Sequence, residues 1–428
     1  MPVSHWQGAI APKSPAESGT WTALPRVALP TLAGTLAAIW MNMSRSCRAA
    51  GGQASDTAGR LPMDDGARAT GGSGPVRDRQ RGGRSRWARR SSYVPQRGDD
   101  VADHGGATYA ALDLGTNNCR LLIARPTGDS FRVIDAFSRI IRLGEGVSSS
   151  GQLSEPAIAR AVEALTVCRD KMRNRGVTRA RLIATEACRA AENGDAFQAQ
   201  VRDVVGLDLE IIDRETEAAL AATGCTPLFD RQSKGVILFD IGGGSSELVR
   251  LGPSTEVVRG PPKPHIQSWV SLPVGVVTLA ERHGGVAVTA ELFEKMIAEV
   301  SGYLAAFATA NGSDLDGVHL LGTSGTVTTI AGVHLDLPRY DRKRIDGCWL
   351  SDEEISGVVE RLVGMDYDAR VASPCIGSER ADLVLAGCAI LEAIRRAFPC
   401  PRLRVADRGL REGMLVELMR ADGAWGST

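Results

Sequence analysis

Two aspartates, each followed at once by a glycine-containing turn, are the residues of this sequence best suited to chemistry. Asp113 begins the segment Asp-Leu-Gly-Thr-Asn, and Asp240 begins the segment Asp-Ile-Gly-Gly-Gly-Ser-Ser-Glu. Both segments lie between apolar runs, and alignment of the two aspartates also aligns Gly115 with Gly242. An apolar run, a small-residue turn and a second apolar run are typical of a buried β-hairpin. Two copies in register predict two related domains that face a shared cleft.

The composition of these turns favours phosphate binding together with a divalent cation. Glycines and small polar residues allow consecutive backbone N–H groups to approach a phosphate closely and to form an anion-binding nest. An aspartate at a strand end offers carboxylate oxygen, and Mg²⁺ usually binds one or two carboxylates together with substrate phosphates. For either copy alone, a tight turn in which the aspartate caps the loop is an equally good interpretation. The pair instead favours a phosphate site with Mg²⁺ bound by Asp113 and Asp240.

Length and composition limit the possible classes of protein. The chain has 428 residues, which predicts two or three domains, and its zero net charge and sparse aromatic residues do not point to nucleic acid or to a bilayer. Its nine cysteines are odd in number and include no Cys-x-x-Cys spacing, so a reducing cytoplasm fits them better than a disulfide framework. The histidines are scattered, and no zinc site is expected. We expect a cytoplasmic protein without membrane binding or sequence-specific nucleic acid binding.

The first hundred residues differ in kind from the rest. Residues 44–106 are rich in Gly, Ser, Arg and Asp and lack apolar periodicity, so they cannot bury enough surface to order themselves. The arginines around Trp87 could contact RNA or a phosphate polymer, but a solvated tail is the interpretation that we favour. The apolar stretch 27–43 is interrupted by Pro and Gly and is short for a membrane span. We therefore expect residues 1–106 to be a disordered extension, or to precede a true translation start such as Met63.

From Tyr109 onward the pattern alternates between strands and helices, as in a layered α/β fold. We expect a first domain over 107–232 and a second over 233–428, each large enough to hold its own core. Apolar spacing predicts a helix that begins after Ser154 and an Ala-rich helix that carries Glu217. The other expected strands are at 181–185, 209–212, 269–272, 318–321 and 402–405. One further helix is marked by its apolar residues Phe197, Val201 and Val204. The remaining expected helices begin after Gly275, span 289–308, 351–364 and 378–397, and begin at Leu410.

Five segments together resemble a known family. They are Asp113-Leu-Gly-Thr-Asn, Ala184-Thr-Glu-Ala-Cys-Arg, Glu210-Ile-Ile-Asp-Arg-Glu-Thr-Glu-Ala, Asp240-Ile-Gly-Gly-Gly-Ser-Ser-Glu and Pro273-Val-Gly-Val-Val. The set is similar to the exopolyphosphatase / guanosine pentaphosphate phosphohydrolase family of the actin and sugar-kinase superfamily. The resemblance runs from about residue 107 to the C-terminus and implies two ribonuclease-H-like (actin-like) domains with the active site in the cleft between them. It is closest to the short two-domain form of the family, and it leaves room for a homodimer.

The resemblance implies a role for each residue of the site. Glu217 matches the glutamate that activates the attacking water, and Arg189 matches an arginine that binds substrate phosphates. Asp113, Asp240 and Glu247 match acids of the metal site. The residues that match a phosphate cradle are Gly115, Thr116, Asn117, Gly242, Gly243, Gly244 and Ser245, and those that match a nucleotide contact are Gly322, Thr323, Ser324 and Gly325.

Simpler explanations stay open for several of these residues. Glu217 lies in the first turn of its helix, where the helix dipole stabilises a carboxylate in any case. Arg189 could only tie down a loop, although a planar guanidinium is well suited to phosphate. The segment 322–325 could be an ordinary turn. Residues 118–120 read Asn-Cys-Arg where relatives often carry Ser or Thr, which weakens any role for a hydroxyl there.

These inferences together predict a phosphoanhydride hydrolase. We expect it to release terminal orthophosphate from inorganic polyphosphate, from guanosine pentaphosphate or from both, by Mg²⁺-assisted attack of a water that Glu217 deprotonates. A kinase of the same superfamily would share both aspartate–glycine turns and would transfer the phosphate to an acceptor. A sensor would bind guanosine pentaphosphate without turnover, and an actin-like filament would need large self-association surfaces. The sequence alone does not separate the two hydrolase substrates.

Overall fold

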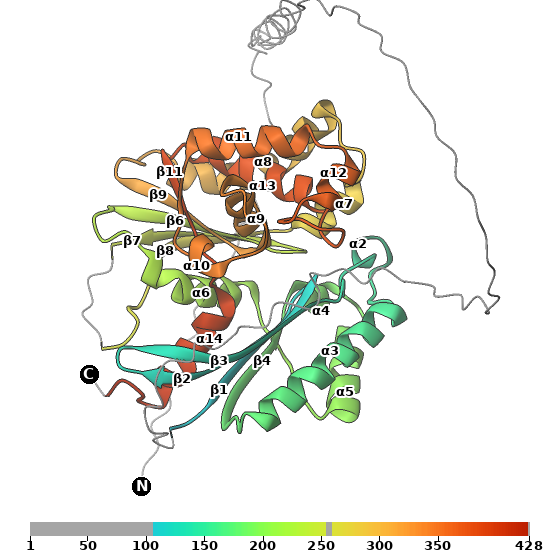
Figure 1. The fold of residues 1–428 in the computed structure, drawn as a ribbon, viewed down its shortest axis with the longest axis vertical. Coiled ribbons are helices and arrows are strands. Elements are labelled where there is room, and N and C mark those ends of the chain that lie inside the picture. Colours follow the sequence, from blue (N-terminus) through green and yellow to red (C-terminus); the bar gives the residue numbers. More distant parts are fainter. Residues whose placement is uncertain (1–105, 254–258, 427–428) are drawn as a thin grey trace, which may run out of the picture. The chain divides into compact units, whose positions relative to one another are not determined.

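A computed structural model describes residues 106–253 and 259–426 of the chain. The predicted N-terminal extension, up to residue 105, lies outside the described residues, and so do the arginine-rich stretch and the apolar stretch within it. The described chain forms two mixed sheets with helices, which confirms the predicted α/β class (Figure 1). None of the helices in these two ranges is long and apolar enough to cross a membrane.

The first sheet has the first predicted hairpin at its centre. Its strand order is β3-β2-β1-β4-β5, in which β2 is antiparallel to β1 and β3, while β4 is parallel to β1 and β5. The strands are β1 (Tyr109–Leu114), β2 (Asn118–Thr127), β3 (Ser130–Ile140), β4 (Arg179–Ala184) and β5 (Glu210–Ile211). The helices of this half are α2 (Val147–Ser150), α3 (Glu155–Asn174), α4 (Glu186–Ala190) and α5 (Gly194–Val205).

The second sheet repeats this plan around the second hairpin. Its strand order is β10-β11-β9-β6-β7-β8, with β9 parallel to β6 and β11. The strands are β6 (Gly235–Ile241), β7 (Ser246–Gly252), β8 (His265–Leu272), β9 (Val318–Thr323), β10 (Trp349–Ser351) and β11 (Arg402–Val405). Its helices are α7 (Val276–His283), α8 (Ala290–Asn311), α9 (Ser324–His334), α10 (Arg342–Ile345), α11 (Asp352–Val363), α12 (Tyr367–Ala372) and α13 (Val384–Ala397).

The two hairpins have the same register, as their aligned sequences predict. Asp113 pairs with Arg120 across the first hairpin, and Asp240 pairs with Glu247 across the second. The order β3-β2-β1-β4-β5 of the first sheet recurs as β8-β7-β6-β9-β11 in the second, to which β10 is added at one edge. The repeated order confirms the prediction of two ribonuclease-H-like halves, while the limits 107–232 and 233–428 remain predictions.

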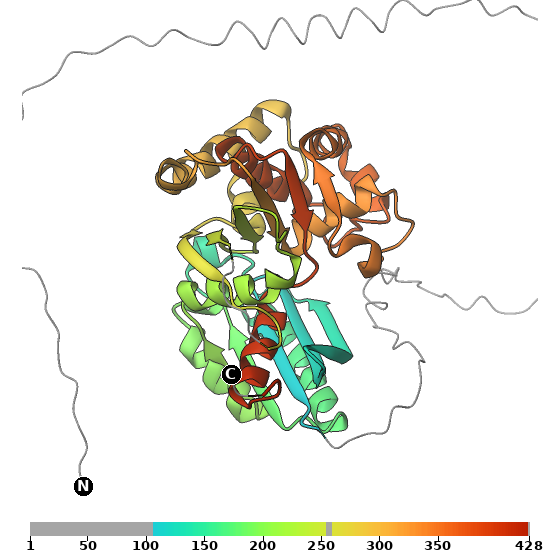
Figure 2. The same cartoon turned by 90° about the vertical axis from the view of Figure 1, so that its left-hand side faces the viewer.

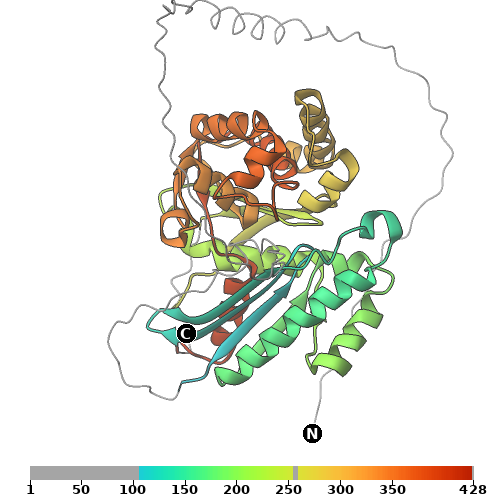
Figure 3. The same ribbon diagram turned by 45° about the vertical axis from the view of Figure 1, so that its right-hand side comes forward.

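Two helices pack against each other between the sheets (Figures 2 and 3). They are α6 (Arg214–Cys225), which is followed by the short helix η1 (Thr226–Leu228), and α14 (Leu410–Ala421). Glycines bring them into backbone contact: a Cβ built on Gly413 would lie 2.0 Å from the Leu220 carbonyl oxygen, and one built on Gly224 would lie 1.9 Å from the Gly409 carbonyl oxygen. No side chain fits at either position, so this crossing depends on glycine.

The last helix completes the core of the first half. Met414 and Met419 of α14 are fully buried against Tyr109 and Ala111 of β1. Helix α6 covers the second sheet in turn, because its Ala222 packs in one cluster with strand residues of that sheet. The chain therefore crosses between the halves twice, and the crossing helices fix how the two hairpins meet.

The structure differs from the sequence-based expectations in a few elements. Strand β3 and helices α10 and α12 were not expected; β3 is an edge strand that is only half buried, so its sequence mixes polar and apolar residues without a clear run. Helix α5 is present, but Val204 is 62% exposed, and Val205 completes its buried face instead. The last long helix of the second half begins at Val384 rather than near residue 378.

Candidate active site

The structure places the two predicted turns directly opposite each other. A Cβ atom built on Gly243 would lie 2.8 Å from Thr116 Cβ, and one built on Gly244 would lie 2.9 Å from Thr116 Oγ1 and from Glu186 Cγ. Contacts this short leave no room for a side chain at either position, so glycine is required where the turns meet. The corners that carry Asp113 and Asp240 therefore confront each other, as the duplicated hairpins predict.

The backbone amides of the two turns divide into engaged and free groups. Gly115 N–H donates to the Asn118 carbonyl at 2.9 Å, and Gly242 N–H donates to the Ser245 carbonyl at 3.0 Å, which is the same bond in both turns. Several other turn amides donate to no acceptor within the described ranges. They are those of Thr116, Asn117, Gly243, Gly244 and Ser245. These free amides can form an anion-binding cradle, whereas Gly115 and Gly242 hold the turns in shape.

Buried carboxylates gather beside the turns. Burial raises the pKa of Asp240 to about 6; Arg120 opposes this rise, and Asp113 adds to it. Burial, followed by the charge of Asp240, raises the pKa of Glu247 to about 7, although Ser271 Oγ donates to Glu247 Oε1 at 2.8 Å. The protein by itself therefore leaves an excess of negative charge here that a bound cation would offset.

Glu217 is held in the first turn of α6. The N-cap Asp213 accepts a hydrogen bond from the Thr216 amide at 2.7 Å, so the start of this helix is fixed. Burial, followed by the charge of Glu247, raises the pKa of Glu217 to about 9, and Arg189 opposes this rise. Arg189 Nη2 lies 3.1 Å from Glu217 Oε2, and both side chains are largely buried. The pKa of Glu217 is thus raised by its surroundings, and one arginine orients its carboxylate.

Every nitrogen of the Arg189 guanidinium donates to a protein acceptor. Nε and Nη2 donate to Glu186 Oε2 at 3.0 and 2.6 Å, and Nη1 donates to the Ile212 carbonyl at 2.6 Å. Nη2 also donates to Glu217. In this arrangement Arg189 supports Glu217, and its direct contact with a substrate phosphate remains a prediction.

The sequence analysis did not assign three arginines near the site: Arg120 and Arg411 lie near Asp113, and Arg380 lies near Arg120. Arg120 is on β2, Arg380 precedes α13 and Arg411 is in the first turn of α14. Burial raises the pKa of Asp113, and Arg120 and Arg411 both oppose that rise. Burial lowers the pKa of Arg380 and of Arg411, and the charge of Arg120 lowers both further. Like-charged guanidiniums held this close together are suited to a polyanion.

These three arginines have no fixed partner in the protein. Within residues 106–253 and 259–426, the side chain of none of Arg120, Arg380 and Arg411 makes a hydrogen bond or an ion pair. A signal for the first was present in the sequence, because Arg120 aligns with Glu247 when the two turns are superposed. The other two come from distant segments, and no local pattern connects them to the turns.

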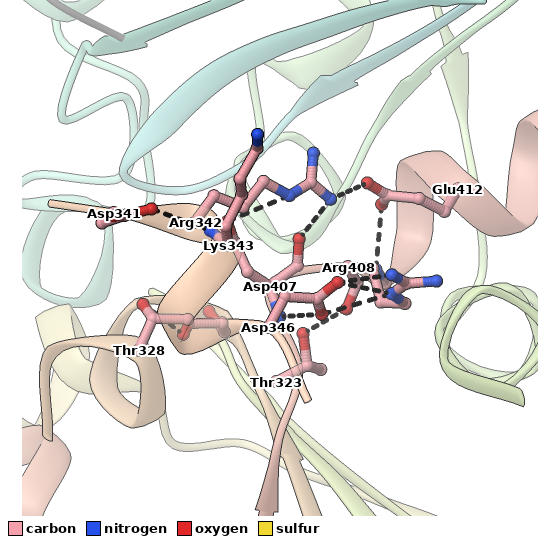
Figure 4. A network of polar contacts seen from close by, with 11 residues as sticks. Thr323, Thr328, Asp341, Arg342, Lys343, Asp346, Asp407, Arg408 and Glu412 are labelled. Atoms are coloured by element: carbon pink, nitrogen blue, oxygen red, sulfur yellow. Dashed lines mark hydrogen bonds and ion pairs between the residues drawn. The ribbon is translucent and has the colours of Figure 1, made fainter. Parts of the chain in front are cut away.

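The segment predicted to contact a nucleotide lies beside the second aspartate. Ser324 has a φ of 83° at the start of α9, and its hydroxyl donates to Asp240. Thr323 Oγ1 donates to the Arg408 carbonyl at 2.7 Å (Figure 4). A Cβ on Gly322 would lie 2.6 Å from the Phe239 ring, so this glycine serves packing. The contact of residues 322–325 with a nucleotide remains a prediction.

The donor set at the turns fits Mg²⁺. The buried Asn117 Oδ1 accepts no hydrogen bond from any described residue, which leaves an oxygen free in the turn that follows Asp113. No group of three or more His, Cys, Asp or Glu in the described ranges forms a complete metal site. Mg²⁺ does not require one, because it binds one or two carboxylates and completes its octahedron with phosphate oxygens and water.

Comparisons with known proteins agree with this geometry. Residues 122–422 match the sequence model described as the Ppx/GppA phosphatase family. A guanosine-5'-triphosphate,3'-diphosphate pyrophosphatase of Photobacterium profundum is 27% identical over 323 residues, which are 73% of this chain and 59% of that protein. Exopolyphosphatase 2 of Mycobacterium tuberculosis is 29% identical over 330 residues, which are 72% of this chain and 98% of that protein. The chain thus spans little more than half of the first relative and nearly all of the second.

Solved structures show the same likeness. An exopolyphosphatase-like protein has a TM-score of 0.66 and 27% identity, with coverage of 74% of this chain and 98% of that chain. A Ppx/GppA protein of Aquifex aeolicus has a TM-score of 0.61 and 26% identity, with the same coverage of both chains. The residues 122–422 that match the family model include the second hairpin and both crossing helices.

Proposed function

Because this chain belongs to the Ppx/GppA phosphatase family, we propose that it is a phosphoanhydride hydrolase that releases terminal orthophosphate from inorganic polyphosphate, from guanosine pentaphosphate or from both. The observation that carries this proposal is the meeting of the two turns, where Gly243 and Thr116 bring free backbone amides together next to Glu217. A relative named exopolyphosphatase and one named for guanosine pentaphosphate support the two substrates.

The free amides of the two turns bind the terminal phosphate. Free amides of both turns lie near one another because the turns face each other across the contact of Gly243 with Thr116. The unpaired guanidiniums of Arg120, Arg380 and Arg411 neutralise the oxygens of this phosphate and of the next one in the chain. Preorganised groups of this kind usually supply the largest share of catalysis in phosphoryl transfer.

Glu217 acts as the general base that accepts the proton. Its carboxylate accepts a proton from a water that attacks the terminal phosphorus opposite the leaving oxygen, and a single in-line displacement releases orthophosphate. Arg189 keeps the carboxylate aimed, through the contact of 3.1 Å between Nη2 and Oε2. A base with a raised pKa accepts a proton readily once it has lost its own.

Asp113, Asp240 and the free Asn117 Oδ1 would hold Mg²⁺, with Glu247 behind them. When bound, Mg²⁺ supplies positive charge to the phosphoryl oxygens and to the acidic cluster.

We place the protein in the cytoplasm, because all eight cysteines in the described ranges are free thiols, as a reducing compartment favours.

The test is release of orthophosphate by the purified full chain with Mg²⁺, measured side by side on polyphosphate and on guanosine pentaphosphate. The proposal expects turnover of at least one substrate and loss of turnover in EDTA. Binding of guanosine pentaphosphate without phosphate release would instead identify a sensor. ATP consumption that depends on an added acceptor would identify a kinase.

A further inference from the structure

A pocket of about 540 Å³ opens beside the crossing of α6 and α14, and none of the residues that line it belongs to the facing turns or to the acids around them. Its volume is within the range of pockets that hold small molecules. The start of β3 lines it with Arg132, and α10 lines it with Lys343. The first turns of α14 close the pocket with Glu412 and Val416. A ligand here would therefore contact both halves of the protein.

The charges in this pocket are only partly neutralised. Arg342 Nη2 lies 3.1 Å from Glu412 Oε1, and Arg408 pairs with Asp346 (Figure 4). Both carboxylates of the lining are thus paired with arginines of the lining. Two further cations of the lining, Arg132 and Lys343, are not paired.

Neither of these two cations has an acidic partner in the described part of the chain. Lys343 and Arg132 are exposed, and the side chain of neither makes a hydrogen bond or an ion pair with a described residue. Figure 4 shows the Lys343 side chain extending away from the network of α10 and α14. Two free cations that line one pocket are suited to adjacent phosphate groups of one ligand.

The rest of the lining distinguishes between a bare phosphate chain and a phosphorylated ring. Phe131, Val133, Pro227, Pro261 and Val416 present apolar surface in the same pocket. A bare phosphate chain gains nothing from such surface, whereas a flat aromatic ring buries its faces there. Asp346 and Glu412 keep further acceptor lone pairs, which suit the N–H groups of a base or the hydroxyls of a sugar.

We propose that this pocket is a second site, separate from the hydrolytic one, that binds a nucleoside diphosphate. Arg132 and Lys343 hold its two phosphates, and the apolar wall around Phe131 holds its base. The proposal does not depend on the hydrolytic function, because no residue of the facing turns contributes to the pocket.

The test uses the full chain in EDTA with ADP as the probe. Isothermal titration should show binding that weakens about tenfold or more when Lys343→Glu or Arg132→Glu reverses a charge in the pocket. Arg344→Glu is the matched control, because Arg344 is the exposed neighbour of Lys343 on α10 and does not line the pocket. Its affinity for ADP should equal that of the wild type.

Photolabelling with an azido-adenine analogue of ADP locates the binding site directly. Label is expected in peptides that contain residues 130–133, 342–346 or 412–416. The proposal is overturned if label appears only in peptides of the two turns, or if the three variants bind ADP equally. It is also overturned if pyrophosphate prevents labelling of the pocket peptides at the same concentration as unlabelled ADP, since the ring would then contribute nothing.

Discussion

Arg120 and Glu247 occupy equivalent positions in the two hairpins, and they carry opposite charges. Each is the direct cross-strand partner of a corner aspartate, since Asp113 pairs with Arg120 and Asp240 pairs with Glu247. The duplicated hairpins therefore differ in the charge of the residue that lies across from the corner aspartate. The first brings a cation to the place where they face each other, which suits phosphate, and the second brings an additional acid, which suits a metal ion.

Removal of Arg120 should weaken substrate binding more than it slows the chemical step. We expect Arg120→Ala to raise KM for polyphosphate about 10- to 100-fold, because one charge-assisted contact to phosphate is lost. Steady-state kinetics with Mg²⁺ measure this. Arg139→Ala is the control, because Arg139 forms a solvent-exposed ion pair with Glu163 at 2.8 Å and should leave KM unchanged. An unchanged KM in Arg120→Ala would remove this residue from the site.

Loss of Arg189 should shift the pH dependence of turnover. Burial raises the pKa of Glu217 and Arg189 opposes that rise, so Arg189→Ala raises the pKa of Glu217 further. Glu217 acts only when deprotonated, and the acid limb of kcat should therefore move to higher pH. Kcat measured from about pH 6 to 10 tests this shift. In Arg189→Lys the acid limb of kcat should lie closer to that of the wild type, because lysine keeps the positive charge. If the acid limb of kcat does not move in Arg189→Ala, then Arg189 does not act through Glu217.

Stability without metal should fall as pH rises. Asp240, Glu247 and Glu217 have pKa values of about 6, 7 and 9 in the folded protein. Each lies above the value of an unfolded carboxyl group, so the folded state binds these protons more tightly and their stabilisation is lost as pH rises through the folded values. Thermal unfolding in EDTA should give a Tm that decreases from about pH 5 to about pH 9.

Mg²⁺ should counteract this loss. At about pH 8 the cation binds carboxylates that have already lost their protons, whereas at about pH 5 it must compete with protons, so its effect on Tm should be larger at the higher pH. Asp240→Asn should reduce the shift caused by Mg²⁺. A Tm that rises steadily from pH 5 to pH 9 in EDTA would contradict the protonation of this cluster.

The crossing of α6 and α14 should not tolerate a side chain at its centre. A Cβ on Gly413 would lie 2.0 Å from the Leu220 carbonyl oxygen, so we expect Gly413→Ala to cost about 1–3 kcal/mol of unfolding free energy. Gly302→Ala is the matched control, because Gly302 lies within α8 with open space around it and should stabilise by about 0.5–1 kcal/mol. Denaturant unfolding measures the free energy of unfolding of both variants. If Gly413→Ala is as stable as the wild type, then the two helices can move apart without loss of stability.

Local patterns were sufficient to predict the hairpins, the helix of Glu217 and the facing of the turns. The hairpins and the helix depend on residues near one another in the chain, such as Asp113 and its following glycine, and the facing of the turns follows from the repetition of that pattern at Asp240. Arg380 and Arg411 could not be found in this way, because they reach the site only through the packing of the second half and the crossing of α14. The same crossing places Met414 in the core of the first half, a contact that no periodicity within α14 specifies.

The central claim is that Glu217, held between facing turns, deprotonates the attacking water. Its most direct test compares phosphate release by Glu217→Gln and Glu215→Gln, two substitutions in the first turn of the same helix, of which only the first alters the residue beside Arg189. The account predicts that Glu217→Gln loses about 10²- to 10⁴-fold in kcat while substrate binding is kept, and that Glu215→Gln retains its activity. Full activity of Glu217→Gln would contradict the account.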